Sequence, residues 1–272
     1  MNPYESPSAE LDFEVGELDV AIAVYDGIGA AARNWYRFIA VGVIALIAYY
    51  ASICTCIGWI VVLPLLMFGG YSFLVEAEAG EASIGTLFRG VGEHFGTAFL
   101  SMWGLMLCYI PITVPLIIAI ATVMFWDGLP EPGEQQTTWT QVAALQAIGF
   151  VWGLAIVRLM LAPFFIVDQG HGALEAFSAS WEVTEGNWLG LAALQILLLL
   201  LNTPSTVITN GWNIYMQALP PSQQIEVMAT GMALILGSLL FQMIAGVLGL
   251  TFFASAYSQL ARRGSHSPDA TA

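Results

Sequence analysis

The chain has 272 residues, of which 58% are hydrophobic and 10% charged, with a mean hydropathy of +0.76 and a formal net charge of −14. An ordinary soluble domain carries roughly 25% charged residues, so this composition excludes one. With six basic and 20 acidic residues, the chain also lacks the clustered Lys and Arg of a nucleic-acid-binding surface. The apolar residues form blocks long enough to cross a bilayer, which takes about 20 residues, and they predict an all-α polytopic membrane protein.

The N-terminal segment changes character near residue 19. Residues 1–18 contain two Pro and five acidic residues, which is typical of a disordered tail. From Asp19 to Trp35 we expect an amphipathic helix, because apolar residues recur there at spacings of three and four. These positions are Ala21, Val24, Ile28, Ala31 and Trp35.

Six membrane-spanning helices are predicted in the domain that runs from residue 19 to residue 257. In chain order they cover about residues 36–52, 57–75, 97–121, 142–167, 187–207 and 227–257. Pro64 is expected to kink the second span, Pro111 and Pro115 to interrupt the third, and Pro204 to break the outer end of the fifth. Residues 258–272 are expected to form a short cytoplasmic tail.

Two further amphipathic segments precede later spans. Within residues 76–96, the string Phe88-Arg-Gly-Val-Gly92 matches Tyr25-Asp-Gly-Ile-Gly29 at an offset of 63. A third segment, Gly172–Gly186, matches the first at an offset of 153, which places Asn187-Trp188 on Asn34-Trp35. This pattern predicts three interfacial helices and a threefold repeat of amphipathic helix plus helical hairpin. Trp35, Trp181 and Trp188 are the expected interfacial anchors.

The distribution of arginine predicts the orientation in the membrane. Arg33, Arg37, Arg89, Arg262 and Arg263 all fall on the side of the two termini, and the three opposite loops contain no Arg. By the positive-inside rule, both termini are cytoplasmic. We therefore expect a multi-pass protein of a bacterial inner membrane.

Two strings carry a resemblance to a known family. Ala173–Trp188 (ALEAFSASWEVTEGNW) resembles a Ser-Trp…Thr…Gly-Asn signature of YciC-like bacterial multi-pass membrane proteins, and Gly69–Gly90 is similar to a second region of theirs. That family is similar to the membrane domain beside some glycerophosphoryl diester phosphodiesterases. Glu185 and Ala79 stand where the family usually has basic residues, so the anionic-lipid contact of those bases is not implied here. The resemblance covers most of residues 19–260, and it implies a fold without an activity.

Polar side chains inside predicted spans are the candidate site residues, because such groups are costly in a membrane. Arg158 is the only charged residue within a predicted apolar block. It is either a snorkelling anchor or the partner of an interfacial acid such as Glu185 or Asp168, or else an anion- or lipid-headgroup site between helices. Gln195 and Gln242 are expected to hydrogen-bond between helices.

The sequence favours a non-enzymatic membrane protein without a catalytic, cofactor or metal site. His94, His171 and His266 fall in predicted cytoplasmic segments, and Cys54, Cys56 and Cys108 form no disulfide framework. The expected partners are membrane lipids, other membrane proteins or a second copy of the chain, and not nucleic acid. The alternative is a small-solute or lipid transporter with a site between the repeats. A cavity lined by Arg158, Gln195 or Gln242 would favour that alternative.

Overall fold

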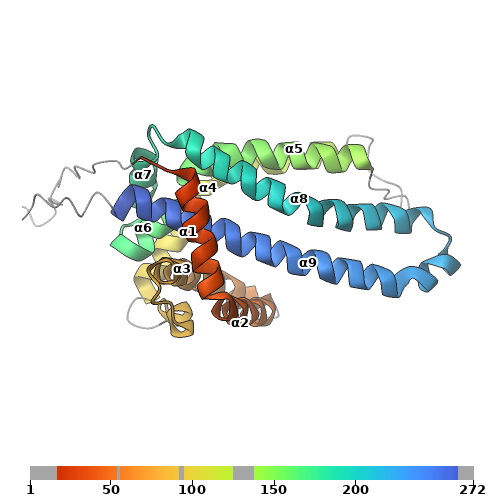
Figure 1. Ribbon diagram of the computed structural model, residues 1–272, viewed down its shortest axis with the longest axis horizontal. Helices are drawn as coiled ribbons and strands as arrows, with labels where there is room; N and C mark the ends of the chain where they lie inside the picture. Colours follow the sequence, from red (N-terminus) through yellow and green to blue (C-terminus); the bar gives the residue numbers. More distant parts are fainter. Residues whose placement is uncertain (1–16, 54–55, 92–94, 125–137, 263–272) are drawn as a thin grey trace, which may run out of the picture.

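The computed structural model describes residues 17–53, 56–91, 95–124 and 138–262, in which the regular elements are all helical (Figure 1). The α-helices are α1 (Val20–Arg33), α2 (Trp35–Ile53), α3 (Cys56–Ala79), α4 (Phe95–Met124), α5 (Trp139–Ile156), α6 (Ala162–Gln169), α7 (Ala173–Val183), α8 (Trp188–Ala218) and α9 (Pro221–Tyr257). Short 3₁₀ segments are η1 (Ile84–Phe88) and η2 (Val157–Leu159), and η3 (Ser258–Arg262) is a π-turn. Cys54, His94, Arg263 and His266 lie outside the described residues.

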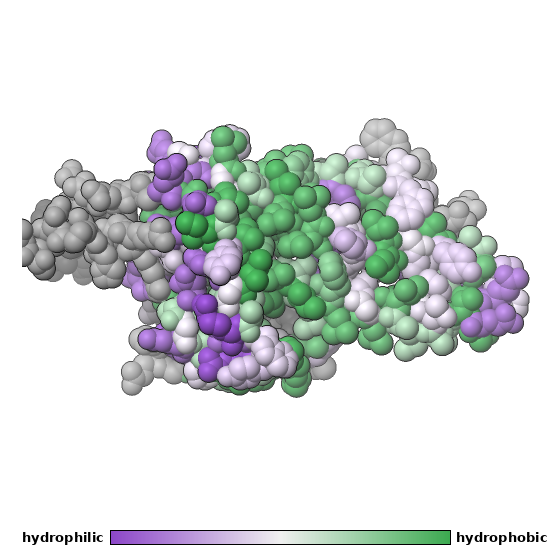
Figure 2. Space-filling view, viewed as in Figure 1, coloured by the Kyte–Doolittle hydropathy of each residue, from purple (hydrophilic) through white to green (hydrophobic). Residues whose placement is uncertain are grey.

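The prediction of six helices long and apolar enough to span a membrane is confirmed. Within the described residues, six helical stretches are long and apolar enough to cross a membrane, and they correspond to α2, α3, α4, α5 with α6, α8 and α9. Figure 1 shows α5, α8 and α9 running along the long axis of the molecule. In Figure 2 a broad hydrophobic band covers α8 and α9, between hydrophilic side chains at the α1–α7 end and at the α8–α9 turn. We call the α1–α7 end, near which both described chain ends lie, the terminal end.

The protein core lies at the terminal end. The ring of Tyr257, at the end of α9, stacks on Phe164 and packs edge-to-face on Phe165, both of α6. Tyr71 of α3 packs against the far side of this aromatic group through Phe164. Towards the α8–α9 turn, by contrast, large apolar side chains of α9 are exposed, as a lipid-facing surface requires.

Helix α1 crosses the end of α9 and docks through small residues (Figure 1). Its N-terminus is capped by Asp19, whose carboxylate accepts from the backbone N–H groups of Ala21 and Ile22. Its buried side consists of Ala23, Gly27 and Ala30. A Cβ atom on Gly27 would lie 3.0 Å from the backbone nitrogen of Phe252. Small side chains are therefore what allows the two backbones to approach.

Helix α7 repeats this arrangement. Its buried residues are Ala176, Ala179, Ser180 and Val183. At the offset of 153 residues, three of them fall on the three buried positions of α1. The first and third units therefore match in the positions that they bury as well as in sequence.

The second unit differs from the other two. Where an amphipathic helix was expected, the described residues form the five-residue 3₁₀ segment η1. Residues 92–94 lie outside the described part. Of the Phe88–Val91 string only Phe88 lies in η1, whereas Tyr25–Gly29 lies entirely within α1. Gly90 and Gly92 match Gly27 and Gly29, which lie within α1, but Gly85 stands where α1 has Ile22, and a glycine disfavours helix by about 1 kcal/mol.

Two expectations about helix interruption are wrong. Helix α4 continues through Pro111 and Pro115, and α8 continues through Pro204. The break lies instead in the fourth span, between Ile156 and Ala162, where η2 separates α5 from α6. The last helix also continues as η3 past the predicted boundary at residue 257, with Leu260 and Ala261 buried.

Candidate functional site

Arg158 lies in the break of the fourth span and is held against α7. Its guanidinium carbon lies 3.8 Å from the centroid of the Trp181 ring, which is a cation–π contact. Nη2 donates to the carbonyl of Trp181 at 2.8 Å, and Nε donates to Oγ1 of Thr184 at 3.2 Å. In the described part of the chain these partners are neutral, and neither Asp168 nor Glu185 forms an ion pair with this arginine.

Ser180 and Thr184 complete the junction between η2 and α7. The Ser180 hydroxyl donates to the carbonyl of Arg158 at 2.6 Å, and the Thr184 hydroxyl donates to the carbonyl of Ser180 at 2.8 Å. A helix break leaves carbonyls without intrahelical donors, so a buried hydroxyl at this point satisfies one of them. The Ser-Trp-x-x-Thr part of the signature string therefore holds the fourth span to α7.

The Gly-Asn part of the same string forms the corner into α8. Gly186 has a φ of 81°, which favours glycine. The Oδ1 atom of Asn187 accepts from the backbone N–H of Leu18 at 2.9 Å. A Cβ atom on Gly190 would lie 2.9 Å from a methyl carbon of Leu18, so the segment before α1 packs closely on the start of α8.

The three predicted intramembrane polar residues are not brought together by hydrogen bonds. Gln195, half-buried on α8, faces α5, where a Cβ atom on Gly153 would lie 2.5 Å from its Nε2. Its Oε1 atom is buried without a hydrogen-bond partner among the described residues. Gln242 is exposed on α9. Arg158 contacts α7 instead of either glutamine.

The predicted interfacial tryptophans are all exposed. Trp35 and Trp188 are the first residues of α2 and α8, and Trp181 lies on α7. Their exposed fractions are 63%, 50% and 48%, respectively. Their role as membrane anchors stays a prediction, and these positions are compatible with it.

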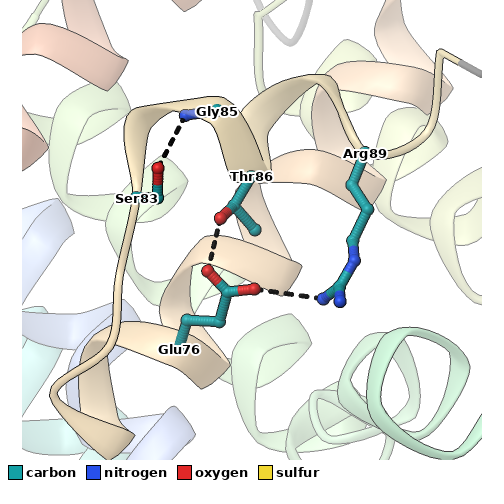
Figure 3. A network of polar contacts seen from close by, with 5 residues as sticks. All are labelled: Glu76, Ser83, Gly85, Thr86 and Arg89. Carbon is teal, nitrogen blue, oxygen red and sulfur yellow. Dashed lines mark hydrogen bonds and ion pairs between the residues drawn. The ribbon is translucent and has the colours of Figure 1, made fainter.

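A second polar junction, around Glu76, was not anticipated from the sequence (Figure 3). One carboxylate oxygen of Glu76 pairs with Nη1 of Arg89 at 3.1 Å, and the other accepts from the hydroxyl of Thr86. Ser83 caps η1 by accepting from the N–H of Gly85 at 3.3 Å. Together these contacts fasten the η1 segment to the end of α3. The sequence feature that could have pointed to the Glu76–Arg89 pair is an arginine 13 residues after a glutamate in a chain with only six basic residues.

A third junction gathers polar groups around the end of α9. The Tyr257 hydroxyl donates to Oδ2 of Asp168 at 2.9 Å, and the Ser258 hydroxyl donates to Oε1 of Glu78 at 3.0 Å. The N–H of Asp19 donates to Oε1 of Gln259 at 3.0 Å. The end of α9 is thus bonded to α6, α3 and the start of α1. No group of three or more His, Cys, Asp or Glu that could hold a metal occurs among the described residues.

Apolar grooves open on the membrane-facing surface of the bundle. One lies between α2, α3 and α9 (about 280 Å³), one between α1, α2 and α9 (about 290 Å³) and one between α4 and α5 (about 420 Å³). None of these three grooves is lined by Arg158, Gln195 or Gln242. Their chemistry suits hydrocarbon.

Residues 38–260 match the family described as Domain of unknown function (DUF7847). The chain belongs to this family. No curated protein and no solved structure gives a match. The matched segment begins within α2, so α1 precedes it. It contains the residues of all three junctions, apart from Asp19.

Proposed function

We propose that this DUF7847 protein is a non-enzymatic integral membrane protein that acts through contacts with lipids or with other membrane proteins. The observation that supports this function most directly is the orientation of α1 and α7. Both helices turn small residues towards the bundle and leave large apolar side chains exposed, among them Ile28 (48%) and Leu174 (75%). Exposed apolar side chains on a helix at the end of a membrane bundle suit insertion among lipids.

The two flanks of α1 differ in polarity. At about 100° per residue, Val24, Ile28 and Ala31 fall on one side of the buried stripe, and Asp26 and Arg33 fall on the other. The apolar flank continues into the α1–α2–α9 groove, which Ala31 helps to line. The helix is therefore built to lie with one flank in the membrane and one in water.

The flanks of α7 have the same polarity. Phe177 and Trp181 fall on the side that corresponds to Ile28, whereas Glu175 and Glu182 fall on the opposite side. The apolar flank of α7 carries the Trp181 ring on which the guanidinium of Arg158 rests. Lipid headgroups are accordingly the expected neighbours of this cation–π pair.

The proposal also covers the membrane in which the protein lies, the side on which its termini lie and its kinship with a known family. By the positive-inside rule, both termini lie in the cytoplasm, and the membrane is a bacterial inner membrane. The kinship with YciC-like proteins is retained as a prediction on the strength of the Ala173–Trp188 string. Transport stays the alternative, although the three grooves described above contain none of the polar side chains expected of its site.

Spin-label depth measurements test the proposal. Single cysteines replace Ile28 and Leu174 in a chain whose native cysteines are changed to serine, and the labelled protein is reconstituted in liposomes. We expect both labels to be more accessible to oxygen than to a water-soluble nickel complex. Labels at Asp26 and Glu182, the matched controls on the opposite flanks, should show the reverse. Equal accessibility on both flanks would contradict the proposal.

A further inference from the structure

We propose that Arg158 and the groove between α4 and α5 together bind one anionic phospholipid, with its phosphate on the guanidinium and an acyl chain in the groove. This inference rests on the proposed function, since it names a specific lipid partner. It is argued from the shape of the groove, from the position of Arg158 and from its charge.

The groove has the shape and chemistry of a site for one acyl chain. Its volume is about 420 Å³, and Pro115 and Ala119 of α4 and Ala147 and Ala155 of α5 form much of its wall. These small side chains leave the hollow between the two helices. From Ala147 to Ala155 it extends for about 12 Å along α5, most of the roughly 15 Å depth of one hydrocarbon leaflet.

Arg158 continues the groove towards the terminal end. Val151 and Ala155 lie four residues apart on one side of α5, and Arg158 follows Ala155 by three residues, in η2 just past the end of α5. Beyond this end of the groove, α7 packs on the same two elements, with the Phe177 ring against Tyr109 of α4 and the Trp181 ring against Arg158. We infer that the α4–α5 groove leads towards Arg158 and α7, where a lipid headgroup would lie.

The positive charge of Arg158 favours the binding of an anion. Its contacts within the described residues are a ring, a backbone carbonyl and a hydroxyl, and its Nη1 atom has no hydrogen bond there. A half-buried cation without a counter-ion is costly near a membrane, and a guanidinium binds phosphate in a fixed geometry. A lipid with net negative charge compensates this cation, whereas a zwitterionic lipid brings its own positive group.

One residue of the groove wall carries a buried polar atom. The indole N–H of Trp152, one of the lining residues, is buried without a hydrogen-bond partner among the described residues. A buried tryptophan N–H usually finds an acceptor. A turn of the Trp152 ring towards the groove would let it donate to the ester carbonyl of a bound phospholipid, which lies between phosphate and chain.

Native mass spectrometry of the full chain in detergent tests the headgroup contact. Phosphatidylglycerol and phosphatidylcholine are titrated separately, and we expect tighter binding of phosphatidylglycerol. Arg158→Gln should weaken that binding roughly tenfold, because it removes a charge-assisted contact. Arg33→Gln, which removes the same charge from the polar flank of α1, should leave it unchanged. Equal binding of both lipids, or an equal loss in the two variants, would overturn the proposal.

A groove-closing substitution tests the chain contact without touching α7. Ala155→Trp should abolish the preference for phosphatidylglycerol, whereas Ala193→Trp, at an exposed position on α8, should retain it. This pair decides the matter even where Arg158→Gln fails to fold. If Ala155→Trp binds phosphatidylglycerol as the unaltered chain does, the groove is not the site. The spin-label depths at Ile28 and Leu174 do not depend on either result, so the proposed function can stand while this inference fails.

Discussion

Ser180 has no exposed surface, and its hydroxyl donates to the carbonyl of Arg158 at the break of the fourth span. Replacement by alanine leaves that carbonyl without this donor in a buried position. We expect Ser180→Ala to lower the free energy of unfolding by about 1–3 kcal/mol, measured by denaturant titration in detergent. Ser178→Ala is the control, because Ser178 is exposed on the same helix and, among the described residues, bonds to Glu182 alone. A similar small loss in both variants would show that the Ser180 bond contributes little.

Gly69 and Gly70 are neighbours in α3 with opposite surroundings. A Cβ atom on Gly69 would lie 1.9 Å from the carbonyl oxygen of Leu87, whereas one on Gly70 meets no atom within 4 Å. Gly69→Ala must push η1 away from α3, and we expect a loss of about 1–3 kcal/mol. Gly70→Ala should be neutral or stabilising by about 0.5–1 kcal/mol. Thermal unfolding measures the stability of the two variants. If Gly70→Ala were the less stable one, η1 would not pack against α3 in this way.

At the scale of elements, α1 depends on one close approach to α9. Gly27→Leu places a side chain against the backbone of Thr251 and Phe252, whereas Gly29→Leu meets only the mobile end of Arg33. We expect Gly27→Leu to raise hydrogen exchange throughout α1 while the middle of α8 stays protected. Gly29→Leu should leave exchange in α1 unchanged. If both variants protect α1 equally, the small-residue contact with α9 does not hold this helix.

The spans were predictable because the apolar blocks are as long as one or two crossings of a bilayer require, and no soluble alternative buries so much apolar surface. The sides of α1 and α7 that pack against the bundle could not be predicted. The sequence drew attention to large residues such as Ile28 and Leu174, but between membrane helices small residues pack and large ones face lipid. Ala23, Gly27 and Ala30 carry little hydrophobicity, so a search for apolar periodicity passes over them.

Arg158 was identifiable because it is a lone charge in a predicted span, but its partners were not. Its contacts with Trp181 and Thr184 join residues 23 and 26 positions apart, and they depend on the break in the fourth span. Pro163, at the start of α6, was the signal for that break, because helices commonly begin at proline. At Pro204 the opposite error occurred, because a break was predicted where the helix is continuous. Side chains next to it bond to carbonyls one turn earlier, as Asn202 does to Leu198, within a continuous helix.

At the scale of the whole molecule, three polar junctions at the terminal end join the ends of spans to one another or to the short helical segments between them. They are the Arg158–Trp181, Glu76–Arg89 and Tyr257–Asp168 contacts. The opposite end of α8 and α9, by contrast, exposes apolar side chains such as Ile225 and Met228. Hydrophilic side chains return at the α8–α9 turn (Figure 2), so we expect the terminal end and this turn to lie at opposite membrane surfaces, with all six spans crossing between them.

Labelling of the α8–α9 turn and of the predicted loop between the third and fourth spans tests that arrangement most directly. In a background whose native cysteines are replaced, a single cysteine is placed at Ser222 or at Pro132, the latter outside the described residues. Intact cells are treated with a membrane-impermeant maleimide, and a cysteine appended to the C-terminus is the matched control. We expect both turn positions to be labelled from outside and the C-terminal cysteine only after lysis. Protection of either turn in intact cells, with labelling on lysis, would contradict the six-span arrangement.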